Sequence, residues 1–332
     1  MSKQLDENDR HKAGTLPDDP EADAQVLVDA PRILTVRQLV EGSAKRAQEP
    51  RTRGACATGH YVLDRNSGGL RPGHCWVFGA ETSWGKSSWA VLLTDLNLRQ
   101  KRGVLIVSFE DSEGVYGDRL LARRADVSAT RLRDGRLKPD ELSRVTGVVN
   151  RAEDAPVFLD ARGKSAEWAC DGIRGLCDEH PDIQLVIVDY LQEARSAKKH
   201  QDRKNEVSFV ASLIRSTVKR LGRAGLIMSQ LTAEEGERPG KYSIRESKDA
   251  AMGAEGILLG FYSSDGGKKA CARDHDKAER VILVAKAKDG PVGYAITQPW
   301  NERWAGFESV SDPDNAAAET GRALGDGEFI EH

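Results

Sequence analysis

The 332-residue sequence predicts an α/β fold in which a mostly parallel sheet is covered by helices on both faces. Unbroken apolar runs, such as residues 104–107 and 185–188, alternate with longer segments that carry apolar residues at helical spacing. Strands that are apolar on both faces are typical of parallel sheets buried between two layers of helices. A hydrophobic content of 39% and a charged content of 30% suit a globular core with polar appendages.

The expected elements follow one another along the chain. A short amphipathic helix is expected over residues 35–48, with Thr35 as its N-cap and Val36, Leu39 and Val40 as its apolar stripe. A first core strand at 75–79 leads through a loop into a helix that begins at Lys86. Later strands are expected at 104–109, 156–160, 185–189, 225–230, 256–262 and 281–285, helices at 114–125, 138–151, 166–177 and 207–221, and an antiparallel finish at 292–298 and 303–309.

Both ends of the chain are expected to stay outside the core. Residues 1–31 are polar, rich in acids and free of aromatics, and the tail is rich in Ala, Gly, Asp and Glu. Such segments cannot bury enough apolar area to offset chain entropy, so disorder is predicted for both. The predicted organisation is an acidic tail over 1–31, a linker helix and basic linker over 32–54, one α/β domain over 55–310 and a second acidic tail over 311–332.

Composition and charge indicate whether the protein binds nucleic acid, crosses a membrane or is secreted. The formal net charge is −3, so any surface that binds nucleic acid must be local. No stretch approaches the roughly 18 apolar residues needed to span a bilayer, and the first residues form no secretory signal. A cytoplasmic location without a membrane partner is expected. Reduced thiols, rather than zinc ligands or disulfides, are expected because no C-x-x-C pair occurs among Cys56, Cys75, Cys170, Cys177 and Cys271.

The segment Trp76–Ser88 predicts a phosphate-binding loop (P-loop) between a buried strand and a helix. Backbone N–H groups in such a loop point at phosphate oxygens, and the helix N-terminus adds a partial positive charge. Lys86 is expected to reach the β- and γ-phosphates, and Ser87 to hold Mg²⁺. Ala80 replaces the first glycine of the motif, which leaves a surface Gly-Lys turn as the alternative. The predicted nucleotide-binding residues are Ala80, Glu81, Thr82, Ser83, Trp84, Gly85, Lys86, Ser87 and Ser88.

Polar side chains follow three further predicted strands. Asp189 fits an acid that organises Mg²⁺, and Glu110 fits a general base that orients the attacking water. Gln230 fits a sensor of the γ-phosphate. The alternatives are a strand-end cap, a solvated loop acid and a satisfied buried amide, respectively. Because open parallel sheets bind ligands beyond the carboxyl ends of their strands, these residues and the P-loop together predict one site for a nucleoside triphosphate.

Two polar segments are expected at the same edge of the sheet. Residues 195–204 are strongly basic and include Arg195, Lys198 and Lys199, whereas residues 232–248 are acidic first and basic later. Long loops of this kind are usually functional, and their cations favour a track for a nucleic-acid backbone over a merely solvated surface. Lys286 and Lys288, after a late strand, could reach a γ-phosphate bound by a neighbouring subunit, or form a simple basic hairpin.

Together the motifs resemble the ATPase domain of bacterial and phage replicative helicases of the DnaB type, within the RecA-like group. The matching segments are Thr58–Asp64, Gly68–Gly73, the P-loop, Ser108–Ser112, Arg119–Ala122, Val186–Gln192, Ser229–Leu231, Arg245–Ser247 and Lys286–Pro291. The resemblance implies a RecA-like P-loop NTPase core, ATP with Mg²⁺ held between subunits of a hexameric ring, and single-stranded DNA in the central channel. It also implies that Arg245, Glu246 and Lys248 contact DNA, and that a loader or primase is a partner.

The chain departs from the family pattern in three places. The residues before the predicted linker helix are not expected to form the family's N-terminal domain, which helps to form the ring and binds primase. Lys288 replaces the arginine that acts across the interface, and an ammonium cannot fork onto phosphate oxygens. Lys248 stands where the family usually has glycine.

The leading hypothesis is an ATP-dependent, ring-forming DNA helicase or translocase that acts on single-stranded DNA during replication. Its catalytic residues would be Lys86, Glu110, Gln230, Lys286 and Lys288, with Ser87 and Asp189 at the metal. One alternative is a RecA-like DNA-binding ATPase, such as a recombination mediator or regulator, that does not unwind duplex. Another is a nucleotide-binding assembly module that has lost turnover through the change at Lys288.

Overall fold

The computed structural model describes residues 35–48, 54–152, 154–231, 239, 243, 253–264, 268–269 and 279–312. The chain divides into two units, Met1–Pro50 and Arg51–His332. The described part of the first unit is helix α1, Val36–Ala47, which agrees with the predicted helix. Thr35 caps it as predicted, since its Oγ1 accepts a hydrogen bond from the Gln38 backbone N–H at 3.2 Å. The predicted apolar stripe of Val36, Leu39 and Val40 is exposed on this helix.

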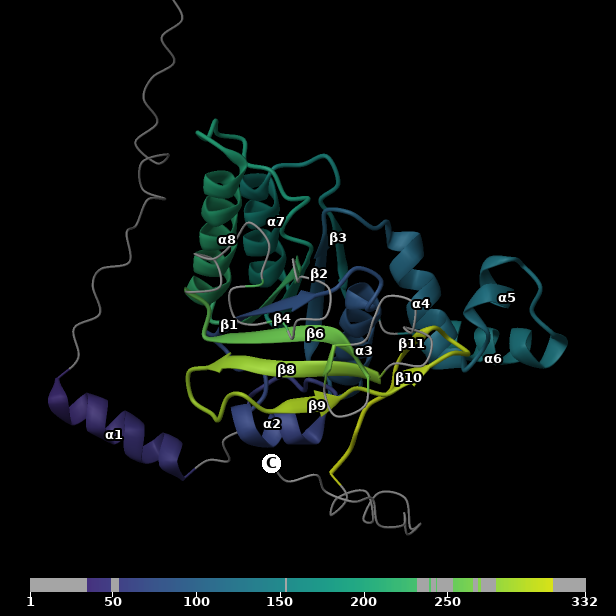
Figure 1. Ribbon diagram of the computed structural model, residues 1–332, viewed down its shortest axis with the longest axis horizontal. Helices are drawn as coiled ribbons and strands as arrows, with labels where there is room; N and C mark the ends of the chain where they lie inside the picture. The colour runs from purple at the N-terminus through teal and green to yellow at the C-terminus, as the bar shows by residue number, and fades with distance from the viewer. Residues whose placement is uncertain are drawn as a thin grey trace, which may run out of the picture. The chain divides into compact units, whose positions relative to one another are not determined.

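The second unit is built on one large sheet (Figure 1). Its described strands run in the order β3, β2, β4, β5, β1, β6, β8 and β9, and β7 pairs with β6. The first six are parallel neighbours, while β7, β8 and β9 are antiparallel. The strands are β1 Cys75–Ala80, β2 Gly103–Ser108, β3 Phe158–Asp160, β4 Ile183–Asp189, β5 Ala224–Gln230, β6 Gly256–Ser264, β7 Lys268–Lys269, β8 Glu279–Ala287 and β9 Ala295–Thr297.

Helices cover both faces of this sheet, because alternate strand residues point to opposite faces and nearly all are apolar. On β2, for example, Leu105 and Val107 belong to the core cluster that contains α7 and α8, which lie side by side in Figure 1. Val104 and Ile106 belong to the cluster that contains α3. The helices of this unit are α2 Tyr61–Ser67, α3 Lys86–Arg99, α4 Glu113–Ala125, α5 Ala129–Arg133, α6 Pro139–Val149, α7 Ala166–Glu179 and α8 Arg203–Arg220.

The predicted α/β class with a mostly parallel, doubly covered sheet is therefore confirmed. The antiparallel part begins one strand earlier than the sequence suggested, at β8, which runs back along β6 and pairs Ala287 with Gly256. Helices α2 and α5 were not predicted, because their seven and five residues are too few for a periodic pattern. Two short strands, β10 Trp300–Asn301 and β11 Gly306–Phe307, form a hairpin near the C-terminal end of the described chain.

Parallel register places the carboxyl ends of the central strands at one edge. Ser108 of β2 pairs with Asp189 of β4, and Ala80 of β1 pairs with Gln230 of β5. The P-loop, the segments that follow β2 and β4, and the carboxyl end of β5 therefore lie side by side. Within the described residues, no helix combines the length and apolar character needed to cross a membrane.

Candidate active site

The loop between β1 and α3 has the backbone conformation of a phosphate cradle. Ser83 and Gly85 both have positive φ, at 63° and 111°, and Gly85 is the N-cap of α3 without a capping side chain. The first N–H groups of α3 therefore have no side-chain cap and are available to an anion. A Cβ on Gly85 would lie 3.0 Å from both Phe307 and Trp300, so the position demands glycine for space as well as for backbone conformation.

Aromatic packing holds this loop in place. The fully buried Trp84 ring lies 5.2 Å from Phe78 and 4.6 Å from Phe307, and its indole N–H donates to the Phe261 carbonyl at 3.1 Å. The Tyr262 hydroxyl donates to the Ser83 carbonyl at 2.8 Å. Trp84, predicted as a nucleotide-binding residue, can thus offer a ligand its backbone but not its side chain.

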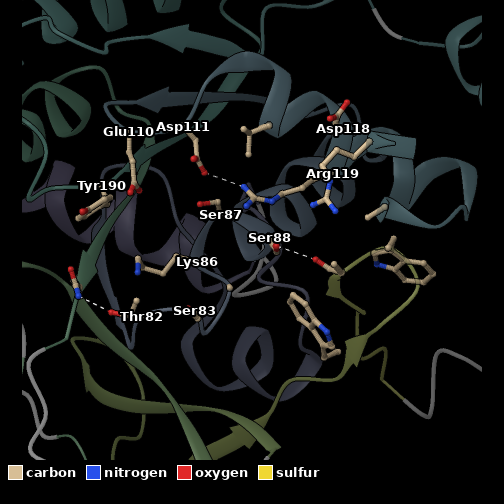
Figure 2. A pocket seen from close by; sticks show the side chains of 18 residues that line it. Thr82, Ser83, Lys86, Ser87, Ser88, Glu110, Asp111, Asp118, Arg119 and Tyr190 are labelled. Carbon is tan, nitrogen blue, oxygen red and sulfur yellow. Dashed lines mark hydrogen bonds and ion pairs between the residues drawn. The ribbon is translucent and has the colours of Figure 1, made fainter. Parts of the chain in front are cut away.

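The loop opens into a cavity of about 600 Å³, within the usual size range of small-molecule sites. In Figure 2, Glu110 and Tyr190 lie on one side of Lys86, and Thr82 and Ser83 lie on the other. The cavity brings together residues from the P-loop, the segments after β2, β4 and β5, helices α4 and α5, and the C-terminal hairpin. Its lining residues are Thr82, Ser83, Gly85, Lys86, Ser87, Ser88, Glu110, Asp111, Val115, Asp118, Arg119, Ala129, Arg133, Tyr190, Gln230, Trp300, Trp304 and Ala305.

Asp189 has the surroundings of an acid that organises a metal. Its side chain is buried, and Oδ2 accepts hydrogen bonds from the Ser87 hydroxyl, at 2.7 Å, and from the Tyr116 hydroxyl. Its Oδ1 is also buried but has no hydrogen-bond partner among the described residues. Burial raises the pKa of Asp189, while these two donors and the Lys86 ammonium oppose the rise. A buried oxygen left without a donor, beside a serine hydroxyl, fits a hard cation such as Mg²⁺.

No group of three or more His, Cys, Asp or Glu side chains that could hold a metal is present among the described residues. Ser87 and Asp189 alone would make an incomplete site. Mg²⁺ is commonly held by one or two carboxylates together with the phosphates of a nucleotide, so these two residues fit a metal that arrives with its nucleotide.

Lys86 and Glu110 both line the cavity, and their opposite charges influence each other's pKa. Burial lowers the pKa of Lys86, and the nearby Asp189 and Glu110 carboxylates work in the opposite direction. Its ammonium also lies 5.6 Å from the centre of the Tyr190 ring. Partial burial and the neighbouring Asp111 and Asp189 raise the pKa of Glu110. A carboxylate with a raised pKa is a better proton acceptor than an ordinary surface acid, which suits a general base.

Gln230 connects the P-loop to the end of β5. Its Nε2 donates to the Thr82 hydroxyl at 2.8 Å, and its backbone N–H donates to Gln192 Oε1 at 3.1 Å. The Gln192 amide in turn donates to the Ser229 hydroxyl at 2.8 Å. Gln230 is half-buried and lines the cavity, so its side chain is within reach of a bound ligand.

Comparison with known proteins agrees with a nucleotide-binding site in this cavity. The family described as the DnaB-like helicase C-terminal domain matches residues 55–309. The chain belongs to this family. One relative is the replicative DNA helicase DnaB of Buchnera aphidicola subsp. Schizaphis graminum. The two sequences are 25% identical over 267 residues, and this alignment covers 77% of this chain and 56% of the relative. The chain is 27% identical over 240 residues to the DnaB of Treponema pallidum, covering 71% and 52%. The chain thus spans about half the length of these curated relatives.

Two solved structures share the fold. One is described as a DnaB-like replicative helicase and its interactions with primase; it has a TM-score of 0.70 and 21% identity, covering 88% of this chain and 70% of that chain. The other is described as an ATPase domain, with a TM-score of 0.71 and 19% identity, covering 84% of this chain and 100% of that chain. These structures agree in fold, and the family match over residues 55–309 confirms the predicted membership of the DnaB-type group.

The predicted DNA-contacting residues are only partly described. Arg195 lies 3.6 Å from Glu206, and Lys198 and Lys199 are exposed on the segment that joins β4 to α8. Arg245, Glu246 and Lys248, assigned from the resemblance to the DnaB-type helicases, lie outside the described residues. Lys286 and Lys288 lie elsewhere, at the amino edge of the parallel strands, because Ala287 pairs with the first residue of β6.

Several residues in and beside the cavity were not identified as site residues from the sequence. Tyr116 and Tyr190 contact the predicted residues Asp189 and Lys86, and Trp300 and Trp304 form the wall that the DnaB-like chain builds from its C-terminal hairpin. Tyr190 belongs to the segment Val186–Gln192, which resembles the DnaB-type helicases, so the sequence did draw attention to it. Nothing in the local sequence marks Tyr116 or the tryptophans, because their roles depend on contacts with distant segments.

We expect Gly85→Ala to lower the free energy of unfolding by about 1–3 kcal/mol, because alanine is strained at φ 111° and its Cβ would crowd Phe307 and Trp300. Urea unfolding measures this change. The control is Gly175→Ala on α7, where an added Cβ meets nothing within 4 Å and stability should hold or rise slightly. Equal stability of Gly85→Ala and the natural protein would contradict the geometry of the loop.

Proposed function

We propose that this chain is the ATP-hydrolysing motor of a ring-forming DNA helicase that moves along single-stranded DNA during replication. The observation that carries the proposal is the convergence of Lys86, Ser87, Glu110, Asp189 and Gln230 around the P-loop. All but Asp189 line the same cavity, and Asp189 is hydrogen-bonded directly to Ser87. The names of the DnaB relatives support the wider activity.

Each residue has a physical role in the proposed reaction. The backbone N–H groups of the P-loop and the Lys86 ammonium would bind the β- and γ-phosphates. Ser87 and Asp189 would hold Mg²⁺, which when bound supplies positive charge to the phosphate oxygens. Glu110 would accept the proton of the attacking water. Gln230 would sense the γ-phosphate through its bond to Thr82 of the P-loop and would transmit the change to the segment that follows β5.

The hairpin wall suits the base of the nucleotide. Trp300 and Trp304 line the cavity together with Ala305, whose carbonyl accepts a hydrogen bond from the Ser88 hydroxyl at 3.2 Å. The Arg280 guanidinium lies 3.9 Å from the centre of the Trp300 ring, which fixes the orientation of that ring. Aromatic surface at this position would pack against a purine whose phosphates lie on the P-loop.

The positions of Lys286 and Lys288 support action between subunits. They lie at the amino edge of the parallel strands, whereas the cavity lies at the carboxyl edge, so they are not placed to serve their own cavity. In a head-to-tail ring, one edge of a subunit can meet the opposite edge of its neighbour. We assign Lys288, aided by Lys286, to the γ-phosphate of the adjacent subunit in a hexamer.

Single-stranded DNA is the proposed track. Arg195, Lys198 and Lys199 follow β4, and with Arg245, Glu246 and Lys248 they would meet the phosphate backbone. Binding of this kind weakens steeply as salt rises. The description of one structural relative names primase as its partner. We propose primase, or a loader, as a candidate partner of this chain.

Replacing Lys86 by alanine should abolish DNA-stimulated ATP hydrolysis and the unwinding of a forked DNA duplex, because the phosphates lose their buried cation. Phosphate release and strand separation measure the two activities. The matched control is Lys138→Ala at the exposed N-terminus of α6, which should keep both. Unchanged hydrolysis by Lys86→Ala would show that the nucleotide binds elsewhere. Intact hydrolysis without unwinding by the natural protein would favour a DNA-binding ATPase that is not a helicase.

Lys288→Ala alone should lose most of its hydrolysis but keep nucleotide binding. Mixed with Lys86→Ala in equal amounts, it should recover roughly a quarter of the natural rate, since random head-to-tail contacts pair an intact P-loop with an intact Lys288 at that frequency. Native mass measurement confirms that the two variants assemble together. A mixed assembly that stays inactive, or full activity of Lys288→Ala alone, would contradict action between subunits.

A further inference from the structure

Tyr116 is a buried residue that contacts the metal-organising acid but has no place in the proposed reaction. We infer that Tyr116 is a positioning residue: its hydroxyl holds the Asp189 carboxylate in the orientation that leaves Oδ1 to Mg²⁺. This inference rests on the proposed function, because it concerns the metal that accompanies the nucleotide. It assigns no new chemistry to Tyr116, which does not line the nucleotide cavity.

The fold fixes where this hydroxyl lies. Helix α4 starts just after Glu110 and Asp111, and Ser112 is its N-cap, with its carbonyl accepting the Val115 N–H at 3.1 Å. Tyr116 thus stands in the first turn of α4, only 4% exposed, and its ring lies 5.4 Å from the ring of Phe158. The same segment that delivers Glu110 to the cavity therefore also delivers the Tyr116 hydroxyl to Asp189.

The two carboxylate oxygens of Asp189 differ in their hydrogen bonding. Oδ2 accepts from both Ser87 and Tyr116, whereas Oδ1, equally enclosed, has no hydrogen-bond partner among the described residues. The Ser87 hydroxyl has a second task, since its oxygen is also expected to bind the metal. Tyr116 is then the donor to Oδ2 that does not share its hydroxyl with the metal. Donors that orient a metal-binding side chain typically change metal affinity about 10- to 100-fold when removed.

Apolar side chains lie beside the Tyr116 ring. The ring also lines a separate cavity of about 210 Å³, bounded by apolar side chains including Val91, Ile106, Leu120 and Phe158. The hydroxyl is the polar end of this otherwise apolar contact surface, and its partner is Asp189. The hydrogen bond to Asp189 thus contributes directly to the placement of both side chains.

The test is Tyr116→Phe in the whole chain, which removes the hydroxyl and keeps the ring. Binding of a fluorescent ATP analogue is measured across a Mg²⁺ titration and again in excess chelator. The Mg²⁺ concentration for half-maximal enhancement of binding should rise about 10-fold or more, while affinity in chelator stays unchanged. Mn²⁺ binding in the presence of the analogue, followed by electron paramagnetic resonance, should weaken in parallel. The matched control, Tyr61→Phe, lies on α2 and should change neither quantity.

An unchanged Mg²⁺ requirement in Tyr116→Phe would overturn the inference, whether or not its melting temperature falls, because a purely structural role would affect only stability. Equal losses of affinity with and without Mg²⁺ would overturn it as well, since they would indicate a distorted P-loop. Failure of the natural protein to bind the analogue would instead refute the proposed function, and the inference with it.

Discussion

Parallel pairing of β2, β4, β5 and β1 is the constraint on which the site depends. It aligns Ser108 with Asp189 and Ala80 with Gln230, so that four strands end at one edge of the sheet. Residues more than a hundred positions apart in the chain, such as Ser87 and Asp189, come within hydrogen-bonding distance as a result. A shift of one residue in this register would turn the strand-end side chains to the opposite face.

Burial gives these residues their chemical character. Apolar strands and helices remove Asp189 and much of Lys86 from water. The opposite charge beside each group offsets only part of the cost of burying it, because burial still raises the pKa of Asp189 and lowers that of Lys86. Glu110 is more exposed, and partial burial, followed by its acidic neighbours, raises its pKa. The rigid, aromatic-packed P-loop supplies the complementary part, a set of backbone donors that need little rearrangement to meet phosphate.

The sequence could predict much of this arrangement because its strongest signals are local. Apolar runs indicated the strands, and the residue at the end of each run indicated the edge, so the sequence predicted that Lys86, Glu110, Asp189 and Gln230 would come together. Contacts set by distant segments could not be read in the same way. Trp300 meets Gly85 through a hairpin more than 200 residues later, and Tyr116 meets Asp189 through the packing of α4 on the sheet. The reversal of direction at β8 likewise has no local signature, because an apolar strand reads the same in either direction.

The most direct measurement is an experimental structure of the chain with a non-hydrolysable ATP analogue and Mg²⁺. We expect the γ-phosphate to contact Lys86 and Mg²⁺ to lie between Ser87 and Asp189. A water should lie beside Glu110, and the base should pack against Trp300 and Trp304. Phosphates bound away from residues 80–87, or Mg²⁺ without contact to the Ser87–Asp189 pair, would contradict it.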